Sequence, residues 1–161
     1  MGVSAMKPKM KRKELMTKTD IVNAVMHVLS EAHLSPEENP LNQAGIVYHY
    51  YSEMESGGHE SLFRWYGQVI NELGIDNYLN KLSGILEEIG AHDYARIEKQ
   101  YCRKLWSLYN ALENDEIEED AFYRIIEKAT AEYYKLNDTL RELLETYFVT
   151  IYADLFDIVD E

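Results

Sequence analysis

The chain has 161 residues, of which 46% are hydrophobic and 28% charged, and it contains only 8 Gly and 3 Pro. This length and composition predict one folded domain with its own hydrophobic core, and they exclude a fibrous or largely disordered protein. With 29 acidic and 16 basic side chains the formal net charge is −13, which disfavours direct binding to nucleic acid or to an anionic membrane.

The first 16 residues differ in charge from the rest of the chain, because they are rich in lysine. No apolar run of secretory or membrane-spanning length follows them, so we expect the protein to be cytoplasmic. Residues 1–16 are predicted to form a flexible basic tail with some residual helix near Glu14, and residues 17–161 an acidic helical domain. The single cysteine, Cys102, cannot form an intrachain disulfide and is expected to be buried.

The first half of the domain is predicted to be helical, with breaks at Pro and Gly. A first helix should begin at Thr19 or Asp20 and end near His33. The pair Asn39 and Pro40 is typical of a helix start, because Asn accepts from free amides and Pro fits the first turn. The helix that follows should end at Gly57 and Gly58, since paired glycines permit a left-handed cap. A shorter aromatic-rich helix is predicted over residues 60–73, where Gly67 could be a further break.

Four more helices are predicted in the second half from apolar residues that recur three or four positions apart. Asp76 should cap the first of them, which stops at Gly90, and Asp93 should cap the next. The last two follow an acidic run over residues 113–120, and the final helix should begin near Asn137 or Asp138. No segment alternates apolar and polar residues in the way of a strand. The fold class predicted is therefore an all-α, single-domain bundle of about six to eight helices.

Three segments resemble a bacterial domain-of-unknown-function family in which a helix ending in Asn-Gly-Gly-Phe precedes an aromatic-rich helix. They are residues 51–63, which contain Ser-Gly-Gly-His, the turn Ile89-Gly90-Ala91, and residues 143–148. Ser56 and His59 stand where that family has Asn and Phe. The resemblance covers about residues 41–157 and implies that Gly57, Gly58 and Gly90 form a structural motif. The family includes an acidic dimeric DNA-mimic protein, whose carboxylates replace phosphates on the DNA-binding face of a transcriptional regulator.

The acidic side chains of the C-terminal third are the candidate partner-binding residues. Residues 113–161 contain fifteen acids and four bases. Side chains three or four apart on a helix lie about 5–6 Å apart, so two rows of carboxylates are predicted. The rows are Glu116, Glu119 and Asp120, and Glu142 and Glu145. Their expected partner is a basic protein, either a DNA-binding regulator or a toxin, although an ordinary solvated helix surface is the alternative interpretation. A homodimer is also expected, with some of the thirteen tyrosines at an interface.

The evidence for an enzyme is weak. His49 and Glu53 are four residues apart and could form a two-His-one-carboxylate metal site if His59 reached them across the glycine turn, but ordinary surface histidines are the simpler interpretation. Adjacent pairs such as Glu87 and Glu88 point about 100° apart on a helix and share no site. Since no nucleophile elbow or phosphate-binding loop is present, we expect no catalytic residue, no bound metal and no cofactor. An immunity or antitoxin protein is the alternative function, and a metal-dependent helical-bundle enzyme is the less favoured one.

Overall fold

The structure is a computed structural model that describes residues 7–32 and 39–160. Within these ranges it contains six α-helices, which confirms the predicted all-α fold. No helix in the described ranges is long and apolar enough to cross a membrane. The elements in chain order are β1 (Lys9–Lys11), the 3-10 helix η1 (Arg12–Leu15), α1 (Lys18–Glu31), α2 (Pro40–Leu73), α3 (Ile75–Glu88), α4 (His92–Glu113), α5 (Glu119–Tyr134), α6 (Thr139–Leu155) and β2 (Asp157–Val159).

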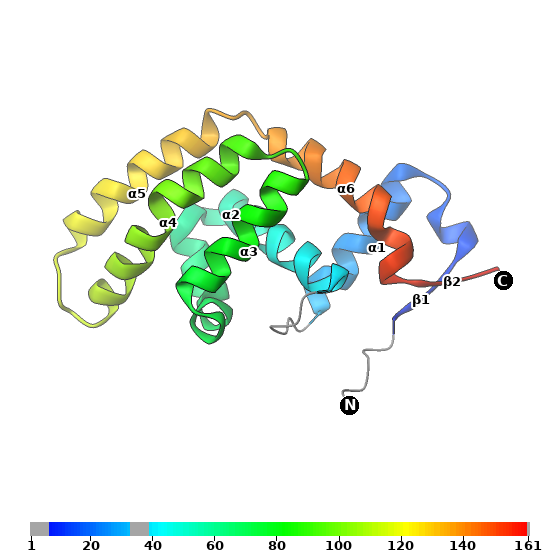
Figure 1. Ribbon diagram of the computed structural model, residues 1–161, viewed down its shortest axis with the longest axis horizontal. Helices are drawn as coiled ribbons and strands as arrows, with labels where there is room; N and C mark the ends of the chain where they lie inside the picture. Colours follow the sequence, from blue (N-terminus) through cyan, green and yellow to red (C-terminus); the bar gives the residue numbers. More distant parts are fainter. Residues whose placement is uncertain (1–6, 33–38, 161) are drawn as a thin grey trace.

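The helices form an elongated body in which sequence neighbours pack against each other. Helix α2 contacts α3, α3 contacts α4, and α4 contacts α5, while α6 returns to pack on α1 and α2. The hairpin of α4 and α5 forms one end of the long axis, and α1 lies toward the other end with η1, β1 and β2 (Figure 1). One apolar core runs through the body, and its largest fully buried aromatic side chains are Tyr50, Tyr78, Tyr94, Phe63, Phe122 and Phe148.

Helix α2 begins as predicted and bends at the paired glycines. The Asn39 side chain accepts a hydrogen bond from the backbone N–H of Asn42 at 2.8 Å, and Pro40 occupies the first turn. Gly57 and Gly58 leave the helical conformation, and Gly58 has a φ of 71° and a ψ of −158°. Gly67 does not interrupt the second limb of the helix. A Cβ there would meet the Trp106 ring at 3.6 Å, an ordinary van der Waals contact, so neither a break nor helix packing requires a glycine at this position.

The helix ends show which local signals were reliable. Gly90 ends α3 as predicted, with a φ of 91° and a hydrogen bond from the Ala91 N–H to the Leu86 carbonyl at 2.7 Å. The predicted caps were wrong at three helices, because α1 is capped by Thr17, α3 by Gly74 and α4 by Ala91. Asp76 and Asp93 lie inside the first turn instead. The helix dipole favours acidic side chains throughout that turn, so their presence does not identify the capping position.

Residues 9–15 differ from the flexible tail expected over residues 1–16. Strand β1 pairs in parallel with β2 near the other end of the chain, so that Met10 lies opposite Ile158. The Arg12 guanidinium is paired with Asp160, and Leu15 of η1 is buried. Each strand has only three residues, which is too short for the alternation that predicts a strand. The sequence pattern therefore could not indicate this pairing of the two termini.

Candidate partner-binding surface

The acidic turn, residues 113–120, joins α4 to α5 at one end of the molecule (Figure 1). Asp115 reverses the chain with a φ of 57°, a left-handed conformation that Asp tolerates better than most residues. The N–H of Glu116 donates to the carbonyl of Ala111 at 2.8 Å, which ties the turn to the end of α4. Glu119 begins α5, where the positive end of the helix dipole stabilises acidic side chains.

The acidic turn carries six carboxylates without a compensating cation. All six are exposed, and none forms an ion pair with another residue that the structure describes. The sequence has no Lys or Arg between Lys104 and Arg124. The turn is also hollowed, with a depression of about 450 Å³ lined by Leu112, Asp115, Ile117, Glu118, Glu119 and Asp120. The turn therefore concentrates six carboxylates, unpaired among the described residues, within eight consecutive residues.

Three of the five candidate partner-binding residues lie in this turn, namely Glu116, Glu119 and Asp120. Asp115 and Glu118 line the same depression and were missed. Helical spacing was the criterion used to choose candidates, but it does not apply before Glu119, where α5 begins, and the chosen Glu116 lies there together with these two residues. The sequence signal that could have found them is the run of acids itself.

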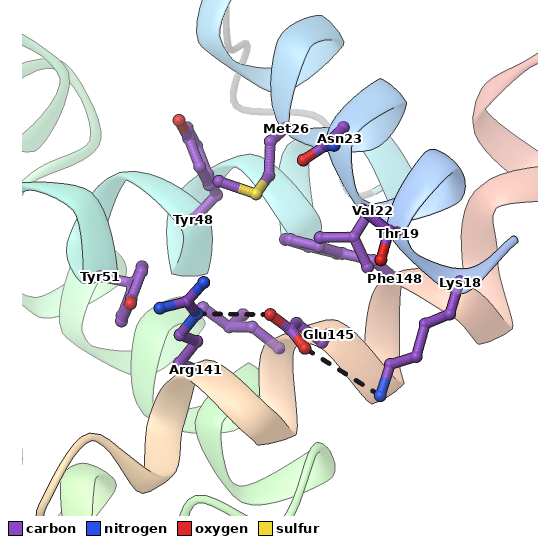
Figure 2. A pocket seen from close by; sticks show the side chains of 11 residues that line it. Lys18, Thr19, Val22, Asn23, Met26, Tyr48, Tyr51, Arg141, Glu145 and Phe148 are labelled. Atoms are coloured by element: carbon purple, nitrogen blue, oxygen red, sulfur yellow. Dashed lines mark hydrogen bonds and ion pairs between the residues drawn. The ribbon is translucent and has the colours of Figure 1, made fainter.

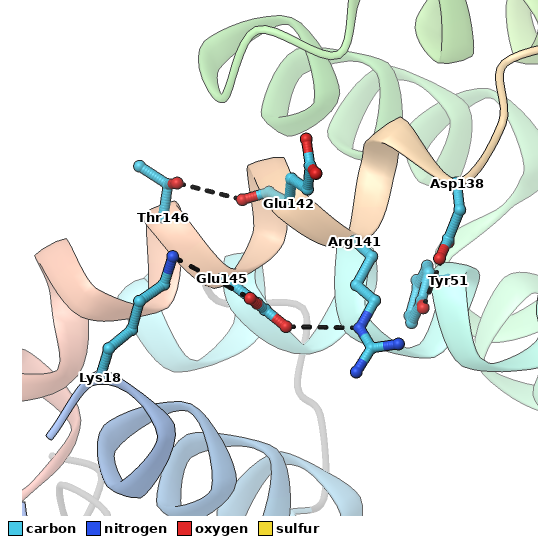
Figure 3. Close-up of polar contacts among 7 residues, drawn as sticks. All are labelled: Lys18, Tyr51, Asp138, Arg141, Glu142, Glu145 and Thr146. Atoms are coloured by element: carbon cyan, nitrogen blue, oxygen red, sulfur yellow. Dashed lines mark hydrogen bonds and ion pairs between the residues drawn. The ribbon is translucent and has the colours of Figure 1, made fainter.

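Helix α6 carries the other two candidates, and it borders a groove of about 310 Å³ together with α1 and α2 (Figure 2). Glu145 lies on the wall of this groove, half-buried, while Glu142 is exposed in the first turn of α6. Glu145 is held between two cations, with Arg141 Nε at 3.3 Å and Lys18 Nζ at 4.0 Å (Figure 3). Its negative charge is therefore offset locally, unlike the charges of the acidic turn.

The two groups of candidates do not form one continuous surface. The acidic turn is at the start of α5, and α6, which carries Glu142 and Glu145, follows the end of α5. The 16 residues of α5 span about 24 Å at 1.5 Å per residue. Between the two groups, α5 exposes two bases, Arg124 and Lys128, beside one acid, Glu127, and the exposed Lys135 follows the end of the helix. The uncompensated negative charge is therefore concentrated at the acidic turn and does not extend as a strip to α6.

His49 and Glu53 each have a partner of their own. His49 Nε2 lies 3.2 Å from the Leu29 carbonyl, and its ring stacks on Tyr66. Burial lowers the pKa of His49, so the neutral imidazole is favoured at neutral pH. The carboxylate of Glu53 accepts a hydrogen bond from the Ser61 hydroxyl at 2.7 Å. These contacts stabilise α2 and its neighbours without assembling a ligand set.

His59 is buried on the other side of the glycine bend, where it contacts α4. Its Nε2 lies 2.9 Å from both carboxylate oxygens of Glu98, which also accepts a hydrogen bond from the Tyr50 hydroxyl at 2.9 Å. His49, Glu53 and His59 therefore do not converge, because the bend turns His59 into the core. Among the described residues, no group of three or more His, Cys, Asp or Glu side chains could hold a metal ion.

Glu98 was missed by sequence reasoning, although its position gave a signal. It lies four residues from Tyr94 and from Cys102, on the apolar side of α4, and all three side chains are buried. An acid at such a position requires buried donors, and Tyr50 and His59 provide them. Cys102 is buried as predicted, and this burial raises the pKa of its thiol.

Comparison with known proteins gives one match. The model of the family described as DMP19-like protein matches residues 33–151, which is more than half of the chain. The matched range contains the glycine bend of α2, the acidic turn and most of α6. Neither the curated proteins nor the solved structures give a significant match.

Proposed function

The chain belongs to the DMP19-like protein family, and we propose that it is an acidic interaction protein that occupies the DNA-binding surface of a basic protein in place of DNA. The observation that carries this proposal is the acidic turn, with six exposed carboxylates and no ion pair among the described residues. The resemblance of the glycine and C-terminal segments to a family with a DNA-mimic member supports the same function.

The acidic turn has the physical properties that mimicry requires. A DNA strand presents one phosphate about every 3.4 Å along its axis, and the acidic turn likewise carries closely spaced charges, with six carboxylates in eight consecutive residues. The packed α4–α5 hairpin holds the turn at the end of the molecule, so a basic groove can approach it without steric hindrance (Figure 1). The carboxylates are already exposed, and their attraction to a basic surface should weaken as salt rises.

A homodimer remains a prediction from the resemblance. Two large aromatic side chains on the surface are candidates for such a contact, because Trp65 is 71% exposed and Tyr134 is 52% exposed. Light scattering after size-exclusion chromatography measures the oligomeric state directly. A monomeric mass at every accessible concentration would contradict the dimer and leave the proposed role of the acidic turn intact.

The decisive experiment is capture of a partner followed by competition with DNA. The full chain is immobilised, incubated with native extract at low salt, and eluted either with salt or with an excess of duplex DNA. We expect a basic partner that duplex DNA displaces, because the acidic turn and DNA would occupy one surface. A partner that binds the chain and duplex DNA simultaneously would exclude mimicry.

The contribution of the acidic turn is tested by charge neutralisation. The variant Glu116→Gln/Glu119→Gln/Asp120→Asn should bind the captured partner about 3- to 150-fold more weakly, at about 0.2–1 kcal/mol for each exposed charge. The matched control Glu72→Gln/Glu88→Gln/Asp154→Asn removes three other exposed acids and changes the net charge equally. Equal loss of binding in the two variants would show that total charge, and not the acidic turn, is responsible. A captured nuclease that the chain inhibits would instead indicate the antitoxin function.

A further inference from the structure

The groove between α1, α2 and α6 has a chemistry that the acidic turn does not share. Its floor is formed by the buried side chains of Val22, Leu144 and Phe148, and Met26 and Tyr48 form one wall. The volume of about 310 Å³ equals that of about ten water molecules and lies at the lower end of the range for small-molecule sites. The groove is thus large enough for a small organic ligand with an apolar body.

The rim of the groove is rich in hydrogen-bond donors. Arg141 Nε donates to Glu145 at 3.3 Å, whereas no described residue is paired with the two terminal nitrogens of its guanidinium group. Figure 2 shows this group projecting into the groove between Tyr51 and Glu145. Lys18 lies beyond Glu145 on the α1 side, and its ammonium is only loosely paired at 4.0 Å. These free N–H donors therefore favour a ligand that carries hydrogen-bond acceptors.

The aromatic wall adds one donor that is free among the described residues, the Tyr48 hydroxyl, because the Tyr51 hydroxyl already donates to Asp138. The Tyr51 hydroxyl donates to Asp138 at 3.4 Å, and burial is the main reason that the pKa of Tyr51 is raised to about 12. Tyr51 therefore stays a neutral O–H donor at physiological pH. The Tyr48 hydroxyl forms no hydrogen bond with a described residue. Both rings offer apolar area next to the floor of the groove.

The charges around the groove nearly cancel, so the net local charge neither attracts nor repels an anion strongly. The lining contains two cations, Lys18 and Arg141, and Glu145 is its one carboxylate among the described residues, although the whole chain has a net charge of −13. Asp138 lies just outside the lining beside Tyr51, so the local charges sum to about zero. Exposed charges beyond about 8 Å are largely screened at physiological ionic strength. Directional donors, rather than a long-range field, would select the ligand.

We propose that this groove binds a small organic acid. The ligand has about ten non-hydrogen atoms in total; its carboxylate is held by the terminal guanidinium nitrogens of Arg141, and its apolar body covers Val22, Leu144 and Phe148. The planar guanidinium fork matches a carboxylate with two parallel hydrogen bonds, which a neutral amide cannot reproduce. This site is separate from the acidic turn and does not depend on the proposed mimicry.

The probes for this proposal are octanoate and 3-phenylpropanoate, with octanamide and 3-phenylpropanamide as neutral controls. The full chain carries 13C-methyl methionine, so that Met26 in the groove reports binding and the core residue Met54 serves as internal reference. We expect the Met26 methyl signal to shift saturably with each carboxylate, at concentrations up to about 20 mM, while the Met54 signal stays in place. The amides should bind at least about tenfold more weakly.

Two substitutions distinguish the guanidinium fork from general charge. Arg141→Gln should weaken octanoate binding by about tenfold or more, whereas Arg64→Gln should leave it unchanged. Arg64 is a matched control, because it is similarly exposed and also pairs with an acid one helical turn away, Glu60 at 3.7 Å. Glu145→Gln should tighten carboxylate binding several-fold, since it removes the competing negative charge and leaves only a weaker neutral acceptor for Arg141 Nε.

Three results would overturn the proposal. The first is no saturable shift of the Met26 signal with either carboxylate. The second is equal binding of carboxylates and amides, which would show a purely apolar groove. The third is unchanged octanoate affinity in the Arg141→Gln variant, provided that its methyl spectrum shows the native fold.

Discussion

The buried pair of His59 and Glu98 is the least expected feature at the scale of single residues. Both side chains are fully buried, and His59 Nδ1 has no hydrogen-bond partner among the described residues. A neutral ring with its hydrogen on Nε2 fits this geometry, because it donates to Glu98 and leaves only a lone pair unmatched on Nδ1. Glu98 then accepts from His59 and from Tyr50, which offsets the cost of burying its charge.

Substitution of His59 tests this pair. His59→Phe, the residue of the resembled family, should lower the free energy of unfolding by about 1–3 kcal/mol, because the buried Glu98 carboxylate loses a hydrogen-bond donor. Adding Glu98→Gln should recover part of this loss, since a neutral amide costs less to bury and still accepts from Tyr50. Urea unfolding of the single and double variants measures the coupling. A double variant no more stable than His59→Phe would show that the charge of Glu98 is not the reason for the loss.

At the scale of elements, the bend of α2 is held from outside the helix. Two tyrosines of α5 bond to acids on the two sides of the glycines, Tyr133 to Glu55 and Tyr123 to Glu60, each at 2.9 Å. The two residues of each pair are far apart in the chain, by 78 positions for Tyr133 and Glu55 and by 63 positions for Tyr123 and Glu60. The glycines permit the bend, and α5 determines the angle at which the two limbs meet.

Two glycine-to-alanine substitutions should change stability in opposite directions. Gly58→Ala is expected to cost about 1–3 kcal/mol, because a φ of 71° with a ψ of −158° strains any side-chain-bearing residue even though the nearest atom, Thr130 Oγ1, is 3.6 Å away. Gly84→Ala should stabilise by about 0.5–1 kcal/mol, because Gly84 is in the middle of α3 and a Cβ there meets nothing within 4 Å. Thermal and urea unfolding measure both changes. Equal effects of the two substitutions would contradict the role assigned to the bend.

At the scale of the whole molecule, tyrosines stabilise the fold throughout its length. The chain has thirteen of them, and several join different helices, as Tyr94 does by accepting a hydrogen bond from the Leu140 N–H of α6. Burial raises the pKa of the Tyr147 hydroxyl to about 12, and it is also the main cause of the raised pKa of Tyr66 and Tyr78. The folded state therefore holds these protons more tightly than the unfolded state does.

Alkaline pH should consequently unfold the protein cooperatively. The stabilisation from a raised tyrosine pKa is fully present below about pH 10, the ordinary value, and is lost as pH rises toward the folded pKa of about 12 for Tyr51 and Tyr147. We expect tyrosinate absorbance to rise together with loss of helical circular dichroism. The protein in denaturant is the control and should titrate near pH 10. Complete ionisation near pH 10 with helicity retained would contradict the burial argument.

Local patterns in the sequence were sufficient for the helices. Apolar periodicity located five of the helices and the second limb of α2, while Asn39 and Pro40 marked the start of α2. Gly90 marked the end of α3, and the paired glycines, predicted to separate two helices, mark the bend within α2. These features depend on residues within one or two helical turns, where spacing and backbone preference act directly. For the same reason the acidic turn could be located from the sequence, since its charge density is a property of eight consecutive residues.

Contacts between distant segments were decided only by the tertiary structure. The pairing of β1 with β2 connects the two ends of the described chain, and the partner of His59 is 39 residues away on α4. Glu145 has the spacing of an exposed acid, yet packing of α1 on α6 places Lys18 beside it. Whether a charge is free or paired, and whether a histidine meets a metal ligand or a buried glutamate, depends on which helices touch. Helical periodicity determines which side of a helix is apolar, and only the packing of the helices determines what that side meets.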